Sequence, residues 1–150
     1  MTPAVQAAKR AGIDFTLHEY EGVQPGEGDY AVAVAKALEL PPERLFKTLV
    51  ASVDGSLSVF VVPADRQLDL RAAGKRVTLA DRTTAERATG YVIGGISPLG
   101  QRKQLPTTVD ESALAWATIL VSAGRRGLQI ELSPSDLVTL TGAAVAAIAK

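Results

Sequence analysis

The strongest constraint on the fold is a glycine-rich segment at residues 90–100, which reads GYVIGGISPLG. Four glycines and one proline within these eleven residues are too many for an ordinary strand. Glycine also allows a ligand to approach bare backbone N–H groups closely. We therefore expect a strand that runs into a rigid, backbone-lined pocket, with Arg102 and Lys103 forming an edge that attracts anions.

Ser97 lies in a pattern that is similar to the G-x-S-x-G elbow of serine hydrolases. The spacing is one residue too long, however, and the next residue is Pro98. That elbow uses the N–H after the nucleophile as an oxyanion donor, and proline has no N–H. We therefore reject Ser97 as a nucleophile.

The charges are distributed unevenly along a chain whose formal net charge is zero. Residues 1–65 carry 5 basic and 9 acidic side chains, whereas residues 66–126 carry 10 basic and 5 acidic ones. This basic stretch fits a partner that bears phosphates, although solvated helix faces would give the same pattern. The candidates for phosphate contacts are Arg102, Lys103, Arg125 and Arg126.

The chain has no cysteine and one histidine. This excludes disulfides, thiolate zinc sites, a cysteine nucleophile and an all-histidine metal site. We expect no metal and no other cofactor. The first ten residues place their cations after the apolar stretch, unlike a secretory signal, and the uncharged run 137–149 is too short to cross a bilayer. We expect a cytoplasmic protein with no membrane or DNA partner.

Short helices and strands are interleaved over residues 1–150 without a linker, so we expect a single domain. Asp54-Gly55 between two alternating segments predicts a β-hairpin. The steady β-α-β rhythm of a doubly wound sheet is absent, which favours an α+β fold with a mixed, curved sheet. Expected helices begin at Pro3 and after Ser133 and cover 30–38, 82–88 and the region near Leu70. Expected strands cover 15–20, 46–53, 57–62, 77–79, 107–109, 118–122 and 128–132, with a polar loop at 21–28 and a tight turn at 123–127.

Several motifs resemble those of the YbaK family, in the same order and over nearly the whole chain. They are TPAV at 2–5, FKTL at 46–49, QLDL at 67–70, TGY at 89–91, GGISPLGQ at 94–101, LPT at 105–107 and RGL at 126–128. The family contains free-standing trans-editing aminoacyl-tRNA deacylases, related to the editing domain inserted in bacterial prolyl-tRNA synthetases. The resemblance implies a closed, barrel-like mixed sheet surrounded by short helices. It also implies clearance of mischarged tRNA, chiefly Cys-tRNA(Pro), with prolyl-tRNA synthetase as a possible partner.

The resemblance gives roles to the glycine segment and to one lysine. Lys47 matches the essential lysine of the family, and residues 94–98 match its G-x-x-x-P loop. This places Gly94 and Gly95 among the catalytic groups, as backbone donors to an oxyanion. The same loop implies substrate contacts from Ile96, Ser97 and Pro98. From spacing alone, Lys47 fits better on the solvent face of a strand, and only the resemblance places it in the site.

Further pocket positions implied by the resemblance are Tyr20, Tyr30 and Ser122, although the two tyrosines also fit a half-buried core. Gln129 stands where the family pattern leads us to expect an aspartate. Glutamine can form hydrogen bonds but carries no charge and cannot act as a base. The amino-acid specificity of the site is therefore open.

The sequence shows no good protein nucleophile: His18 reads as a strand-surface residue, and Asp136 reads as the capping partner of Ser133. The resemblance implies that the substrate supplies its own nucleophile, a cysteinyl thiol that leaves as a cyclic thiolactone. Related editing domains instead recruit a tRNA hydroxyl. Alternatives are deacylation of another amino acid by a hydroxyl or water, a non-catalytic module that binds a tRNA end or a synthetase, and an enzyme for an unrelated acyl ester.

Overall fold

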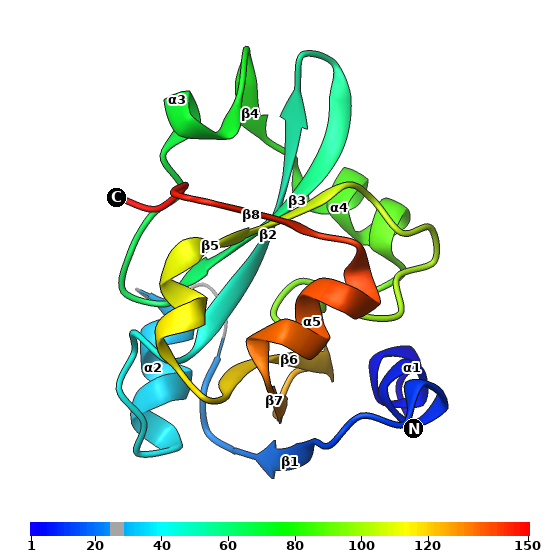
Figure 1. The fold of residues 1–150 in the computed structure, drawn as a ribbon, viewed down its shortest axis with the longest axis vertical. Coiled ribbons are helices and arrows are strands. Elements are labelled where there is room, and N and C mark those ends of the chain that lie inside the picture. The colour runs from blue at the N-terminus through cyan, green and yellow to red at the C-terminus, as the bar shows by residue number, and fades with distance from the viewer. Residues whose placement is uncertain (25–28) are drawn as a thin grey trace.

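The computed structural model describes residues 1–24 and 29–150 (Figure 1). The expected polar loop at 21–28 therefore lies partly outside the described residues. The helices are α1 (Pro3–Ala11), α2 (Tyr30–Ala37), α3 (Leu70–Ala73), α4 (Arg82–Thr89) and α5 (Pro134–Thr141), with a 3-10 helix at Glu111–Ala115. The strands are β1 (Thr16–Glu19), β2 (Phe46–Val53), β3 (Ser56–Pro63), β4 (Val77–Leu79), β5 (Thr107–Asp110), β6 (Ile119–Arg125), β7 (Leu128–Leu132) and β8 (Ala144–Ala146).

The strands form two sheets, so the fold is α+β, as expected. A three-stranded antiparallel sheet has the order β1-β7-β6, and a mixed five-stranded sheet has the order β4-β2-β3-β5-β8. Within the described residues, the pairing between the two sheets is limited to one parallel bridge, Leu45–Leu120. The sheets thus meet at one corner and do not continue into each other, and the expectation of a single closed barrel is not confirmed. Figure 1 shows the small sheet below the long β2–β3 hairpin.

Local signals explain where most helices begin. Asp29, Asp81 and Ser133 cap α2, α4 and α5 by accepting hydrogen bonds from backbone N–H groups in the first turn. Pro3 occupies the start of α1, where a missing N–H costs nothing. None of the described helices is long and apolar enough to cross a membrane.

The main core lies between the two sheets. Apolar side chains of the hairpin, of β6 and β7, and of α1 pack together there, and they include Phe46, Val59, Val61, Ile119, Val121, Ile130 and Ala8, all at most 1% exposed. A smaller cluster around Val34, Ala35 and Leu120 holds α2 against the corner where the sheets meet. Burial of these surfaces, at about 25 cal/mol per Å², is the main force that fixes α2 beside the start of β2.

The prediction of a strand that leads into the glycine segment is wrong, because residues 90–106 form turns and irregular backbone. The chain turns at Val92–Gly95, where the Gly95 N–H donates to the Val92 carbonyl at 2.8 Å. The Tyr91 hydroxyl donates to the Leu99 carbonyl at 2.6 Å and ties the two ends of the segment together. Burial raises the pKa of Tyr91 to about 12, so this hydroxyl stays a donor at neutral pH.

The end of β6 also differs from expectation. β6 extends to Arg125, with an irregularity between Ser122 and Arg125, so the connection to β7 is confined to Arg126 and Gly127. β2 has the expected bounds, Phe46–Val53, and Lys47 is its second residue. The 3-10 helix and β8 were not expected, because β8 is a short exposed segment without alternating polarity.

Candidate active site

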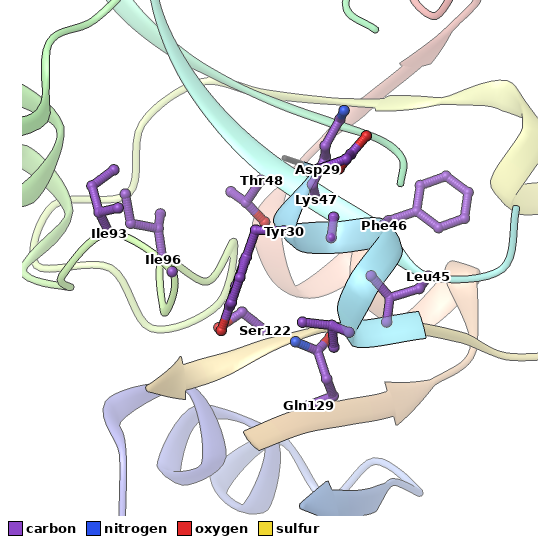
Figure 2. Close-up of a pocket in the computed structure, with 13 residues that line it drawn as sticks. Asp29, Tyr30, Leu45, Phe46, Lys47, Thr48, Ile93, Ile96, Ser122 and Gln129 are labelled. Carbon is purple, nitrogen blue, oxygen red and sulfur yellow. The ribbon is translucent and has the colours of Figure 1, made fainter. Parts of the chain in front are cut away.

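A cavity of about 480 Å³ lies where the two sheets meet. Four parts of the chain line it: the start of α2, the start of β2 with the preceding Leu45, the turn that contains Gly94, and the paired strands β6 and β7. The lining residues are Asp29, Tyr30, Ala31, Val34, Leu45, Phe46, Lys47, Thr48, Ile93, Gly94, Ile96, Ser122 and Gln129 (Figure 2). The volume suits a small ligand or one end of a large one.

Lys47 is the single cation and Asp29 the single carboxylate among these lining residues. In Figure 2 both lie at the end of the cavity opposite Gln129. The Lys47 Nζ donates a long hydrogen bond of 3.4 Å to the Ala64 carbonyl, so its other donor positions are available for a ligand. This end of the cavity therefore carries both a cation and a carboxylate.

Tyr30 forms part of one wall, and Tyr20 supports it from outside the cavity. Tyr30 projects from the first turn of α2, and its hydroxyl lies 2.8 Å from the hydroxyl of Tyr20. Burial is the main cause that raises the pKa of Tyr30, followed by the hydrogen bond with Tyr20. The Tyr30 hydroxyl is therefore neutral at physiological pH and can donate or accept. Tyr20 does not itself line the cavity and acts on it through Tyr30.

The glycine turn forms a second wall. Gly94 has φ +86°, a conformation that glycine adopts without strain. Its N–H donates to no acceptor among the described residues, whereas the N–H of Gly95 is already bound to Val92. Gly95 instead allows a close backbone approach, because a Cβ there would lie 2.7 Å from the Arg125 Cα. The geometry thus offers Gly94, and not Gly95, as a backbone donor to a ligand.

Two residues that line the cavity each carry a buried side-chain oxygen without a hydrogen-bond partner among the described residues. These oxygens are the Thr48 Oγ1 on β2 and the Gln129 Oε1 on β7. Gln129 is only 4% exposed, and it pairs in register with Ser122 on β6. A buried polar atom without a partner costs free energy, so a partner from a ligand is the economical explanation for both.

The structure brings together six of the residues proposed from the sequence: Lys47, Tyr30, Gly94, Ile96, Ser122 and Gln129. It does not bring Ser97 or Pro98 to the cavity; both are buried, and the Ser97 Oγ accepts from the Leu99 N–H. The side chains of Arg102, Lys103, Arg125 and Arg126 are exposed and lie outside the lining. Arg126 nevertheless contacts the glycine turn, because its Nε donates to the Ile93 carbonyl at 2.8 Å.

Sequence reasoning missed Thr48, Asp29, Ile93 and the apolar residues of α2 that line the cavity. Thr48 follows Lys47 directly, which was the available signal. Asp29 is the N-cap of α2, a local role that does not by itself predict a place in a cavity. No cluster of three or more His, Cys, Asp or Glu side chains that could hold a metal occurs among the described residues.

An α+β fold with a cavity between two sheets, lined by a lysine, a glycine turn and apolar side chains, defines a protein that can bind a small ligand or one end of a large one. The family follows from the sequence as a whole: residues 26–140 match the aminoacyl-tRNA editing domain family, and the chain belongs to it.

Named relatives agree with this assignment. The chain is 38% identical over 136 residues to EbsC of Enterococcus faecalis, provisionally named as a Cys-tRNA(Pro)/Cys-tRNA(Cys) deacylase, with 87% of this chain and 83% of EbsC covered. It is 33% identical over 115 residues to the proline–tRNA ligase of Moorella thermoacetica, covering 73% of this chain and 20% of that enzyme. A crystal structure provisionally described as a trans-editing enzyme for prolyl-tRNA synthetase superposes with a TM-score of 0.84 at 25% identity, covering 99% of this chain and 95% of the other.

Proposed function

We propose that this protein deacylates mischarged aminoacyl-tRNA in trans, and that Cys-tRNA(Pro) is its first candidate substrate. The observation that carries the proposal is the cavity itself, which combines Lys47, an unbonded Gly94 N–H and unpaired polar oxygens but offers no activated nucleophile. The names of the relatives support the same substrate class. The proposal places the protein in the cytoplasm, with tRNA and prolyl-tRNA synthetase as partners.

In this proposal each residue of the site has a separate role. Lys47 holds the terminal phosphate or the ester region, and the Gly94 N–H donates to the oxygen that becomes negative as the ester carbonyl is attacked. Removal of one such donor typically costs about 10²–10³ in rate. Tyr30, supported by Tyr20, covers the aminoacyl group, and Ile96 gives it apolar contact.

The nucleophile is the thiol of the cysteinyl group. Its sulfur forms a bond to the ester carbonyl carbon, the bond from that carbon to the ribose oxygen breaks, and the ribose oxygen takes up the proton that the thiol lost. The products are a cyclic thiolactone and uncharged tRNA. A protein without cysteine is compatible with this chemistry.

Gln129 favours a second candidate, deacylation of a different aminoacyl group by a tRNA hydroxyl or by water. The glutamine amide has no charge, so it cannot assist the thiol as a carboxylate would. Its unpaired oxygen suits any short side chain that carries a hydrogen-bond donor, which includes serine and threonine as well as cysteine.

A panel of mischarged tRNAs, assayed with and without prolyl-tRNA synthetase, tests both candidates. We expect Cys-tRNA(Pro) to be cleared faster than Ser-tRNA(Pro) by more than the roughly 10–200-fold that fit alone can achieve. We also expect the thiolactone as the first product. Equal rates, or loss of activity when the terminal ribose hydroxyl is removed, would favour the second candidate. Binding without turnover of any charged tRNA would identify a non-catalytic module, and release of an unrelated ester that uncharged tRNA fails to inhibit would identify a different enzyme.

A further inference from the structure

Two charged residues outside the cavity bind opposite sides of the same residue in the glycine turn. The Ile93 N–H donates to the Glu86 Oε2 of α4 at 2.7 Å. The Ile93 carbonyl accepts from the Arg126 Nε of the β6–β7 connection at 2.8 Å. Glu86 also accepts from Arg82 at 3.3 Å, within the same helix. One residue of the turn is thus held between a carboxylate and a guanidinium.

From these contacts we propose that Glu86 and Arg126 are positioning residues for the proposed deacylation. In a trans peptide the C=O and the following N–H point in opposite directions. Because Arg126 holds the Ile93 carbonyl, the Gly94 N–H is directed away from Arg126 and presented to the cavity that Gly94 lines. Charge on Arg126 also polarises this peptide group and strengthens its N–H as a donor.

The surrounding backbone fits this role. The close approach of Gly95 to the Arg125 backbone seats the turn against the β6–β7 connection, so Arg126 reaches Ile93 over a short path. The Ile93 N–H is the main cause that lowers the pKa of Glu86, so Glu86 stays ionised and holds the turn at neutral pH. Neither residue lines the cavity, which is why we assign positioning and not catalysis to them.

Arg126 is also a candidate for contact with tRNA phosphate, and the two roles give different kinetics. Positioning of the Gly94 N–H acts on the transition state, so its loss lowers kcat, whereas loss of a phosphate contact raises KM. Lysine keeps the charge that attracts phosphate but cannot reproduce the planar guanidinium geometry. Arg125, next to Arg126 and also exposed, does not contact the turn through its side chain and gives a matched control.

The test is steady-state and single-turnover deacylation of the best mischarged tRNA by full-length variants. We expect Arg126→Ala and Arg126→Lys to lower kcat about 30-fold, below the roughly 10²–10³ for complete loss of a donor, with KM changed less than about threefold. Glu86→Leu should lower kcat about tenfold. Glu86→Gln, which keeps an oxygen acceptor, and the control Arg82→Ala should keep kcat within about threefold of wild type, whereas Arg125→Ala, at a candidate phosphate contact, should raise KM and leave kcat within about threefold. Wild-type kcat in Arg126→Lys, or equal rises in KM with unchanged kcat in Arg126→Ala and Arg125→Ala, would overturn the proposal.

An independent readout separates this inference from the proposed function, on which it rests. Amide hydrogen exchange by NMR should show Gly95 protected and Gly94 fast in the wild type, since only Gly95 has a bonded N–H. Arg126→Lys and Glu86→Leu should speed exchange of Gly95 while global protection is retained. Unchanged exchange of Gly95 in both variants would refute the positioning of the turn by Glu86 and Arg126, even if the wild type is an active deacylase. Lack of any wild-type deacylation would instead refute the proposed function.

Discussion

Two polar residues on β7 differ in whether their side chains have hydrogen-bond partners. Gln129 and Glu131 are two positions apart on β7, so their side chains emerge from the same face of the sheet. Glu131 contacts three partners: His18 at 2.7 Å, Arg44 at 2.8 Å and Thr118 at 2.6 Å. The Gln129 oxygen has none among the described residues, although Gln129 is the more deeply buried of the two.

The difference separates a structural group from a binding group. The Glu131 cluster ties β1, the residue before β6 and the segment before β2 together at the corner where the sheets meet, and both carboxylate oxygens of Glu131 have partners. Gln129 lines the cavity, and its buried side-chain oxygen has no partner among the described residues. Variants on the Gln129 side should therefore change activity or substrate choice, and variants on the Glu131 side should change stability.

Lys47→Ala is the strongest test of the cavity side. Removal of the single cation that lines the cavity should lower kcat/KM at least about 100-fold, a loss of about 2.7 kcal/mol of transition-state stabilisation. The melting temperature should be unchanged, because Lys47 makes only one long hydrogen bond to the protein. The control is Lys36→Ala on the exposed side of α2. A variant that keeps more than about a tenth of wild-type kcat/KM would refute the role of Lys47.

Charge reversal at Arg102 and Lys103 tests whether recognition extends beyond the cavity. Phosphate contacts carry no sequence information, so the double change to glutamate should weaken binding of all tRNAs about equally, by about 30-fold at low salt. Wild-type affinity should also fall steeply between low and physiological salt, and the variant should show a shallower slope. A wild-type affinity that is flat with salt would mean that these side chains, which are exposed and outside the cavity, are only solvated.

Much of this arrangement was readable in the sequence because local signals decide it. The Asp54-Gly55 hairpin, the caps at Asp29, Asp81 and Ser133, and the strand that carries Gln129 are each encoded within a few residues. The resemblance added Lys47 and Gly94, which the structure places on one cavity.

The rest depends on contacts between segments that are distant in sequence. His18 had no acid partner nearby in the chain, and its contact with Glu131 exists only because β1 pairs with β7. The role of Gly95 follows from the backbone of Arg125, 30 positions later, and not from its own neighbours. Closure of the sheet was expected from family resemblance, whereas the observed pairing stops at one bridge between the sheets.

Variants of Gln129 test whether this residue determines which aminoacyl group the site accepts. Gln129→Asp restores the expected carboxylate and should raise the ratio of Cys-tRNA to Ser-tRNA deacylation about tenfold, or about 1.4 kcal/mol. Gln129→Met keeps the length but removes both polar atoms, so discrimination between seryl and alanyl groups should fall about tenfold. Gln104→Met, at an exposed position outside the cavity, is the matched control. Ratios that do not move in either variant would remove Gln129 from side-chain recognition.

Glu131→Gln tests whether Glu131 contributes to stability and not to activity, and its effect should be the smallest of these variants. It keeps an oxygen acceptor but removes the charge shared with Arg44 and His18, so we expect a loss of about 1 kcal/mol in the free energy of unfolding. For a chain of this length, that corresponds to a fall of about 2–4 °C in Tm. Deacylation should stay at the wild-type level, since Glu131 does not line the cavity. An equal loss of activity in Glu131→Gln and Gln129→Met would remove the distinction between the two residues.

The loss of unfolding free energy in Glu131→Gln should depend on pH in a defined direction. Hydrogen bonding from Thr118 is the first cause that lowers the pKa of Glu131 in the folded protein, and His18 and Arg44 act in the same direction. The unfolded chain therefore takes up this proton at higher pH than the folded chain, and protonation favours unfolding. The Glu131 contribution is fully present above the unfolded value of about 4.5 and disappears as the pH falls through the lowered folded pKa. Denaturant unfolding from pH 7 to pH 3 should show a constant gap between wild type and Glu131→Gln above about pH 5.5, which narrows on further acidification. A gap that widens in acid would show that the contacts of Glu131 do not stabilise its charged form.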